Sequence, residues 1–352
     1  ASIGSTQGTL VVPNAQTLIA NLTTPSTLNL VILKGGSIVK ASTYTLTING
    51  PFEVGLYQVF SGFNAGNITF DPKAIKEVYP EWWQTNTTPG TTDMSTALHS
   101  AIQSGIKRII FEGSIYAHTT LTVPASTSYL NLIGNSNGGT EFRFTLATGD
   151  GITFAGEADN FQMENISLTS PNSSSGTGIY TNQLNTSPFR DFEFRNVYVS
   201  GFLKGIVLGG TLNGLISGGR MGGQGKAVAN GVGIQLGIDA THGGNHVVIR
   251  KPYVSSYLTG INIISTSPVH ITDPILEALG TGIINGVGNL LLLDNPYFSA
   301  IDTIDINNSG YLYGVSPRGL VVGATTTSHR FYFQTSARAY VDVYKLNSLI
   351  IP

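Results

Sequence analysis

One short segment recurs along this chain at a nearly constant interval, and that recurrence restricts the folds open to it. Pro252, Pro274 and Pro296 stand 22 residues apart in segments that can be aligned with one another. A Gly-Ile step also recurs at intervals of 27, 27, 28, 27 and 22 residues, with its glycines at Gly151, Gly178, Gly205, Gly233, Gly260 and Gly282. A period in this range is typical of a solenoid, in which each repeat buries its apolar face against its neighbours.

Each repeat contains short strands. Residues 192–195, 247–250 and 269–272 alternate apolar and polar side chains with the two-residue period of a strand. Asn, Gly, Asp and Pro interrupt such runs every few residues, which is too often for helices. We therefore predict an all-β chain that forms a single-stranded parallel β-helix with about 22–28 residues per coil. We expect the β-helix to be right-handed, because parallel crossover connections are almost always right-handed.

One phase of the repeat carries asparagines. Asn165, Asn196 and Asn295 occupy it. Asparagine tolerates left-handed backbone at a turn and can bond to its neighbour in the next coil. We expect this ladder to support the fold and to take no part in chemistry.

The chain divides into three regions along its length. We predict an N-terminal β-rich region over 1–78, the β-helix over 79–314, and a C-terminal strand pair over 315–352 that caps the last coil or contacts another subunit. Near the start of the second region, apolar residues follow the spacing of one helical face at Met94, Ala97, Leu98, Ala101 and Ile102. This pattern predicts a helix over 93–105, with Thr92 or Asp93 as N-cap. Laid over the first open coil, such a helix would shield unpaired strand edges.

The composition narrows the classes of function. Charged residues are only 11% and the formal net charge is -2, which argues against general nucleic-acid binding. The chain has no cysteine, so we expect neither disulfides nor thiol chemistry. No apolar run approaches the 18 residues of a membrane span. We expect a protein outside the cell or on a virion surface, with no membrane contact, cofactor or metal.

A family resemblance surrounds the predicted helix. It rests on Glu81-Trp82-Trp83, Thr92-Asp93, Ala97, Ala101-Ile102 and residues 109–116. This pattern resembles the opening motif of the pectate-lyase-like superfamily, which includes phage tailspikes and bacterial polysaccharide depolymerases. Gln84-Thr85 and Pro89-Gly90 replace the Gly-Ala and Asp-Gly that are usual there. The resemblance implies a right-handed β-helix and, as in tailspikes, a homotrimer. The superfamily contains lyases, hydrolases, epimerases and members without known activity, so the resemblance does not choose a reaction.

The repeat also predicts the position of a groove. Residues in excess of a 22-residue coil fall in 168–177, 180–188, 221–230 and 235–245, and insertions in solenoids usually cluster on the binding face. The strand phase places outward side chains in two columns, with aligned residues about 4.8 Å apart. The first column contains Tyr198, Arg220, Tyr253, Ile275 and Tyr297, and the second contains Arg195, Ser217, Arg250, Thr272 and Asp294.

These columns suit a sugar polymer. Tyrosine rings pack on the apolar faces of sugars, and guanidinium groups bind carboxylates, so we expect an extended, acidic polysaccharide as the partner. The alternative is that the same side chains decorate a β surface and pair with Glu193 or Asp294.

Two reactions on such a polymer compete. β-Elimination needs cations at the carboxylate of an acidic sugar and a base beside its C5 proton. Arg220, Arg250 and Lys251 could neutralise the carboxylate, with His270 or Tyr253 as the base. Hydrolysis needs two carboxyl groups, which Asp191, Glu193, Asp273, Glu277 and Asp294 could provide.

The resulting assignments are as follows. The catalytic candidates are Arg220, Arg250, Lys251, Asp273 and His270, and the substrate-binding candidates are Arg195, Tyr198, Tyr253, Tyr297, His242 and His246. The predicted function is a polysaccharide-degrading enzyme, either a lyase or a glycoside hydrolase. The alternative is a non-catalytic tailspike or adhesin rod that binds a glycan.

Two local motifs admit several interpretations. Asp239, His242 and His246 have ligand types suited to a transition metal, but they lie in an expected loop whose spacing does not force the two rings together. Histidines that contact or titrate with a sugar, or a solvated loop, are the alternatives, and we predict no metal. Residues 134–138 match the Gly-x-Ser-x-Gly motif of serine hydrolases without the helix that should follow, so we predict a plain turn.

Overall fold

The computed structural model describes residues 5–113, 115–135, 139–145, 148–171 and 175–315, together with the backbone of three short strands beyond 315. It divides the chain into two compact units, 1–121 with 130–143 and 122–129 with 144–352. Both are built from parallel strands, so the predicted all-β parallel solenoid is confirmed. The predicted right-handedness and the region boundaries at 78/79 and 314/315 stay predictions.

The N-terminal β-rich region of unit 1 is already coiled. Its nine strands form three parallel sheets of three strands each. These are β1 (Gly8–Val12), β4 (Leu28–Ile32) and β7 (Phe52–Val54); β2 (Ala15–Leu18), β5 (Ser37–Lys40) and β8 (Phe60–Ser61); and β3 (Leu22–Thr24), β6 (Leu46–Ile48) and β9 (Ile68–Phe70). Later in the unit come the 3-10 helix η1 (Pro80–Trp82), the helix α1 (Ser95–Ile102), β10 (Arg108–Phe111), β11 (Ile115–His118), β13 (Asn131–Gly134) and β14 (Thr140–Phe144), while β12 (Leu121–Val123) spans the sequence boundary between the units.

The predicted helix exists and is shorter than expected. It covers Ser95–Ile102 within the predicted 93–105. The Asp93 carboxylate accepts hydrogen bonds from the backbone N–H and hydroxyl of Ser95, so Asp93 satisfies a free N–H of the first turn although Met94 is the N-cap residue. The N–H of Phe70 donates to the carbonyl of Ser104, and that of Met94 to Ala117, which joins this segment to β9 and to β11. Its predicted role as a cap stays a prediction.

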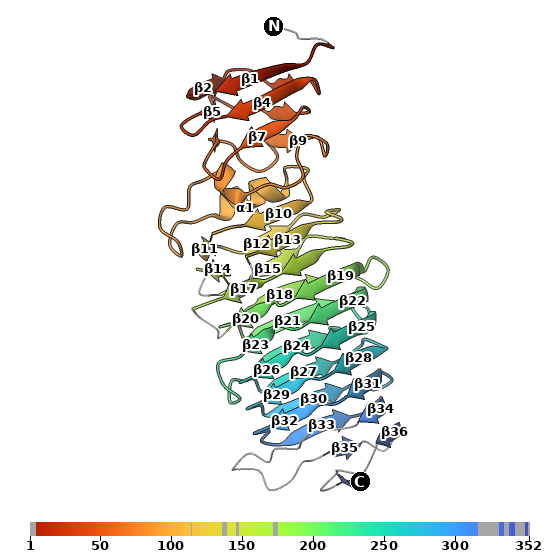
Figure 1. Cartoon of the computed structure of the whole chain (residues 1–352). Helices are drawn as coiled ribbons and strands as arrows, with labels where there is room; N and C mark the ends of the chain where they lie inside the picture. Colours follow the sequence, from red (N-terminus) through yellow and green to blue (C-terminus); the bar gives the residue numbers. More distant parts are fainter. Residues whose placement is uncertain are drawn as a thin grey trace. The chain divides into compact units, whose positions relative to one another are not determined.

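Unit 2 contains three long parallel sheets, which we call sheets 1, 2 and 3 (Figure 1). Sheet 1 contains β16 (Gln162–Glu164), β19 (Phe189–Arg195), β22 (Thr211–Ser217), β25 (Gly244–Arg250), β28 (Val269–Thr272), β31 (Leu290–Asp294), β34 (Tyr311–Val315) and β36 (Arg338–Val341). Sheet 2 contains β17 (Ile166–Thr169), β20 (Tyr198–Ser200), β23 (Arg220–Gly222), β26 (Tyr253–Ser255), β29 (Ile275–Glu277) and β32 (Tyr297–Ser299). Sheet 3 contains β15 (Ile152–Phe154), β18 (Thr177–Asn182), β21 (Lys204–Gly209), β24 (Val232–Leu236), β27 (Thr259–Ile263), β30 (Thr281–Asn285), β33 (Ile304–Asn308), β35 (Phe331–Phe333) and β37 (Leu349–Ile350).

The Gly-Ile repeat forms the core of sheet 3. Its isoleucines are Cα partners in successive strands and are fully buried, at Ile152, Ile179, Ile206, Ile234, Ile261 and Ile283. The glycine before each isoleucine allows the next turn to approach closely. At Gly205, for example, a Cβ would lie 2.4 Å from the carbonyl oxygen of Gly233. The pattern therefore reflects stacking of identical apolar side chains over a backbone contact that only glycine permits.

The predicted asparagine ladder is present, and Gly218 (φ 67°), Lys251 and Asp273 also occupy its position. Asn165, Asn196 and Asn295 have φ values of 58°, 49° and 56°, and Asn196 Nδ2 donates to Asn165 Oδ1 at 3.2 Å. Lys251 and Asp273 occupy the same position in their turns, each with φ 50°. The ladder forms the corner between sheets 1 and 2, so two candidate catalytic residues belong to it.

The C-terminal strands differ from the predicted pair. Within the predicted strand pair over 315–352, the structure has β35 and β36. In the described residues β35 pairs in parallel with β33 of sheet 3, and β36 pairs in parallel with β34 of sheet 1. They thus continue two different sheets, because the solenoid repeat extends past its visible sequence signal. Part of the serine-hydrolase-like motif, residues 136–138, lies outside the described residues.

Candidate functional site

The first outward column has the register that the sequence predicted. Cα partners in β20, β23, β26, β29 and β32 are Tyr198, Arg220, Tyr253, Ile275 and Tyr297. With about 4.8 Å between neighbouring strands, this tyrosine–arginine column extends over about 19 Å. Val254, Leu276 and Phe298 follow its members and are buried, so alternation along each short strand turns the column outward.

The second column lies on sheet 1, also in the predicted register. Its members are Arg195, Ser217, Arg250, Thr272 and Asp294. The guanidinium of Arg195 forms an ion pair with Glu193, two residues earlier on the same strand. Arg250 is exposed and forms no ion pair with any residue that the structure describes. Arg250 can therefore meet a ligand anion without first breaking an internal contact.

The corner between the two columns contains a hollow. It has a volume of about 540 Å³ and is lined by Lys251, Asp273, Pro274, Ile275, Asn295 and Tyr297. The left-handed backbone turns the chain directly from one sheet to the next, and places Lys251 and Asp273 beside the tyrosine–arginine column. The amide of Asn295 donates a hydrogen bond to the carboxylate of Asp273. Asp273 is thus positioned by the ladder that also shapes the backbone.

Three polar side chains of sheet 2 form one connected cluster. The guanidinium carbon of Arg220 lies 4.8 Å from the ring centre of Tyr253, and the hydroxyl of Tyr253 donates a hydrogen bond to the carboxylate of Glu277. That hydrogen bond, together with burial, raises the pKa of Tyr253 above its usual value of 10.0. A phenol with a raised pKa stays protonated at neutral pH. The suggestion that Tyr253 serves as a base stays a prediction; in this structure its hydroxyl is the donor of a hydrogen bond to Glu277.

Glu277 belongs to this cluster, although we had named it only as a possible carboxyl group for hydrolysis and not among the candidate catalytic or substrate-binding residues. It belongs to a second outward column of sheet 2, whose members are otherwise small: Ser200, Gly222, Ser255, Glu277 and Ser299. The signal was available, because residues two apart on a strand share a face and Glu277 is two residues after Ile275.

His270 lies on the strand of sheet 1 that pairs with the strand of Arg250. It belongs to β28 of sheet 1, is half-buried, and has Val248 and Leu292 as Cα partners. It shares an outward face with the second column, since it is two residues before Thr272. The structure therefore distributes the candidates over three places: Arg250 and His270 on sheet 1, Lys251 and Asp273 at the corner, and Arg220 with Tyr253 on sheet 2.

We expected His242 and His246 to lie in one loop, but the structure places them in different elements. His242 belongs to the loop after β24, where its Nδ1 lies 2.8 Å and 3.0 Å from the two carboxylate oxygens of Asp239. His246 is an exposed residue within β25 with φ 53°, in the same position as Asn213 of β22. It belongs to β25 because the strands of sheet 1 are longer here than their apolar runs suggest. The described residues contain no group of three or more His, Asp or Glu that could hold a metal ion.

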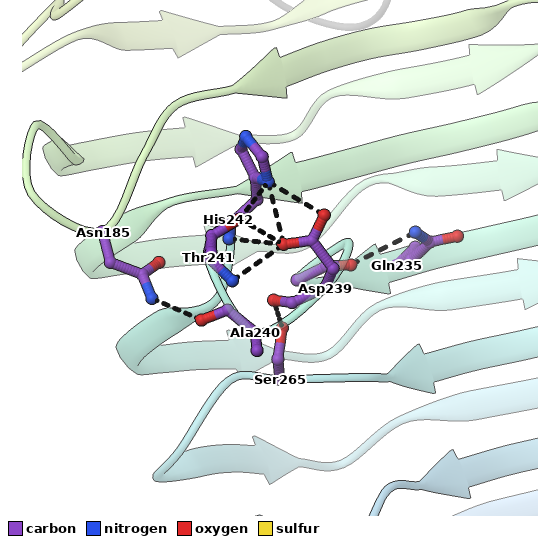
Figure 2. A network of polar contacts seen from close by, with 8 residues as sticks. Asn185, Gln235, Asp239, Ala240, Thr241, His242 and Ser265 are labelled. Carbon is purple, nitrogen blue, oxygen red and sulfur yellow. Dashed lines mark hydrogen bonds and ion pairs between the residues drawn. The ribbon is translucent and has the colours of Figure 1, made fainter.

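The His242 loop is held at several points (Figure 2). Asn185 donates from its backbone N–H to the carbonyl of Thr241 and from Nδ2 to that of Ala240, each at 2.9 Å. From the next turn, the Ser265 hydroxyl donates to the carbonyl of Asp239 at 2.6 Å. Hydrogen bonds from Thr241 and His242 hold the pKa of Asp239 well below its usual range. This loop is therefore an ordered part of the surface, fixed by turns before and after its own.

Comparison with known proteins gives distant structural likenesses. No protein-family model and no curated protein sequence matches the chain. Among solved structures, ORF18 of Geobacillus virus E2 is 12% identical with a TM-score of 0.38, over 75% of this chain and 59% of that one. A double mutant of the tailspike protein of E. coli bacteriophage HK620 is 12% identical with a TM-score of 0.39, over 95% and 60%. The Streptococcus pneumoniae surface protein and adhesin PfbA is 10% identical with a TM-score of 0.35, over 95% and 92%.

These likenesses do not assign the chain to a family. The chain also spans only about three fifths of the length of the first two structures. In the part of the chain that the structure describes, no helix is long and apolar enough to cross a membrane.

Proposed function

We propose that this chain acts on an extended, acidic polysaccharide that lies along the tyrosine–arginine column and passes over the corner hollow. The observation that carries this proposal is the register of Tyr198, Arg220, Tyr253, Ile275 and Tyr297, which aligns rings and a guanidinium over several successive turns. A column of this kind matches a linear polymer, because each strand offers an equivalent position about 4.8 Å further along.

The exposed side chains have complementary tasks in this proposal. Tyr198 and Ile275 are 41% and 39% exposed and offer apolar surface to sugar rings. Arg250 and Lys251, both exposed, offer positive charge to the carboxylates of uronic acid units. Arg220 is already held against Tyr253, so little side-chain freedom is lost when a ligand contacts it.

Cleavage is placed at the corner hollow, where cations and carboxylates meet. For β-elimination, Arg250 and Lys251 neutralise the substrate carboxylate, a base such as His270 removes the C5 proton, and the Tyr253 hydroxyl is a proton donor for the leaving oxygen. For hydrolysis, Asp273 and Glu277 are the carboxyl pair nearest to the tyrosine–arginine column, and their separation would set the stereochemical outcome. The two reactions leave different products, so they can be told apart directly.

The test is a panel of acidic and neutral polysaccharides read for two signals. Elimination creates an unsaturated uronic acid that absorbs in the ultraviolet, together with a new reducing end, whereas hydrolysis creates only the reducing end. The variants should preserve the left-handed corner, so Lys251→Asn and Asp273→Asn are chosen, because asparagine tolerates that backbone. Loss of activity in these variants with full activity in Lys107→Asn, an exposed lysine of unit 1, supports the assignment. Full activity in both corner variants would remove the corner from the reaction.

A second candidate is a rod that binds the glycan without cleaving it. One specific observation favours it: three of the candidate side chains already have partners within the chain, Arg195 with Glu193, Tyr253 with Glu277, and Asp273 with Asn295. Binding of a polysaccharide without either product would establish this role. For both candidates we propose a location outside the cell or on a virion surface, and assembly as a homotrimer, which light scattering on the purified protein would test.

A further inference from the structure

A second hollow lies at the other end of the sheet 1 strands. It has a volume of about 300 Å³ and is lined by Asn185, Pro188, Thr211, Leu212, Gly244, Asn245 and Ser265. Thr211 and Gly244 begin β22 and β25, whereas Ser217 and Arg250 end them next to the corner. The two hollows are therefore separated by the length of a strand. We call the new one the amide–hydroxyl hollow.

Two buried hydroxyl groups beside this hollow have no hydrogen-bond partner among the residues that the structure describes. Thr211 is 2% exposed and Thr266 is fully buried, and the Oγ1 atoms of both are unpaired. They lie on either side of Gly244, since a Cβ built on that glycine would be 2.4 Å from Thr211 Oγ1 and 2.8 Å from Thr266 Oγ1. Buried hydroxyls are almost always hydrogen-bonded, because an unpaired one loses its bonds to water without replacement. Because Thr211 lines the hollow, a water or a ligand atom that enters the hollow is the candidate partner for its hydroxyl.

The walls of the hollow are rigid and uncharged. Asn185 and Ser265 donate their side-chain protons to the His242 loop, which leaves the Asn185 carbonyl oxygen and the Ser265 oxygen as acceptors (Figure 2). Asn245 is exposed and adds an amide, while Pro188 and Leu212 add apolar surface. No charged side chain is among the lining residues. Hydroxyls and amides around an apolar floor match the edge and face of a single uncharged sugar ring.

We propose that the amide–hydroxyl hollow is a subsite for one neutral sugar unit, with Thr211 and Asn245 as its hydrogen-bonding residues. This inference rests on the proposed function, because it takes the natural ligand to be a glycan. It adds that the glycan includes uncharged units, as a side branch or within the main chain, which the arginine columns alone would not recognise. The volume suits one ring, since it is at the lower end of the roughly 300–1,000 Å³ of small-molecule sites.

The test measures binding of single sugars to the full chain. Saturation-transfer NMR and calorimetry are run with glucose, galactose, mannose and N-acetylglucosamine, and with glucuronate and galacturonate as charged counterparts. We expect at least one neutral sugar to bind, and we expect the two uronates to compete poorly with it. Thr211→Val removes the unpaired hydroxyl, and Asn245→Ala truncates an exposed side chain without threatening the fold. Each should weaken binding of that sugar about three- to tenfold, the effect of one lost hydrogen bond, whereas Thr259→Val, a control at a buried threonine in β27, should not.

The results separate this inference from the proposed function. Arg250→Ala should weaken binding of the acidic polymer and leave binding of the single neutral sugar unchanged. If no neutral sugar binds, or binding is insensitive to Thr211→Val and Asn245→Ala, the subsite is refuted even when the polymer still binds through Arg250. If the neutral sugar binds as expected and no acidic polymer does, the subsite stands and the polymer site fails.

Discussion

The three arginines of the two columns should contribute unequally to binding, because the structure gives them different partners. Arg250 is exposed without an ion pair to any described residue, Arg195 is paired with Glu193, and Arg220 is stacked on Tyr253. A hydrogen bond to a charged group contributes about 1.5–3 kcal/mol, which corresponds to roughly 10- to 150-fold in Kd. Arg250→Ala should therefore weaken binding of an acidic oligosaccharide by a factor in this range.

Arg195→Ala and Arg220→Ala should weaken binding of the acidic oligosaccharide less than Arg250→Ala does. Arg195 must share its guanidinium with Glu193, and exposed ion pairs of this kind are each worth about 0–1 kcal/mol. We expect Arg195→Ala to weaken binding less than about fivefold. Arg220→Ala should fall between them, since it also removes a contact with Tyr253 worth about 0.5–1 kcal/mol at an exposed site.

Calorimetry with the acidic oligosaccharide that binds most tightly measures the change in Kd for all three arginine variants, with Lys107→Ala as a control. The ranking should compress at high salt, because the Debye length falls from about 8 Å at 0.15 M to about 3 Å at 1 M. Equal losses for Arg195→Ala and Arg250→Ala would refute the reasoning, since a pre-existing partner would then make no difference.

Three further predictions concern single features of the structure. Glu277→Gln removes the first cause of the raised pKa of Tyr253, so that pKa should move back toward 10 in an NMR titration of labelled tyrosine; an unchanged pKa would mean that burial alone sets it. Ile234 is fully buried between Ile206 and Ile261. Urea denaturation should therefore show that Ile234→Ala lowers the free energy of unfolding by about 2–5 kcal/mol and Ile234→Val by about 0.5–1.5 kcal/mol. Equal effects of the two substitutions would argue against a tightly packed column. The depressed pKa of Asp239 means that its carboxylate contributes stability above its unfolded pKa, near 3.8, and loses that contribution only as the pH falls through the lower folded value. The protection factors of the loop amides, which are exchange rates corrected for their intrinsic dependence on pH, should therefore stay constant between pH 7 and about 5 and should be lower in Asp239→Asn; equal protection in the two proteins would contradict the loop contacts.

The position of the outward columns was predictable because it depends on periodicity. Strand alternation has a period of two, and one buried residue such as Val254 or Leu276 sets the phase of its whole strand. The repeat then aligns equivalent residues in successive turns. The left-handed corner was predictable at its asparagines. Lys251 and Asp273 at the same position were interpreted as catalytic candidates, although aspartate, unlike lysine, also tolerates that backbone.

The partners of these side chains were not predictable in the same way. Glu277 binds Tyr253, and Asn185 fixes a loop more than fifty residues further along the chain. Lys226, in the insertion over 221–230, forms an ion pair with Asp302, a contact across 76 residues. Such contacts depend on rotamers and loop paths, which leave no periodic trace in the sequence.

By itself, the sequence determined the parallel solenoid, its stacked isoleucine core and the register of its outward columns, because identical short-range patterns repeat at an almost constant interval. Only the tertiary structure decided which of the aligned charged side chains form ion pairs and where the surface has a hollow. It left Arg250 without an ion pair to any described residue while pairing Arg195 with Glu193, and it placed Thr211 in the lining of the amide–hydroxyl hollow. The physical reason is that register follows from backbone hydrogen bonds between neighbouring turns, whereas pairing and hollows follow from how individual side chains and inserted loops fill the space around them.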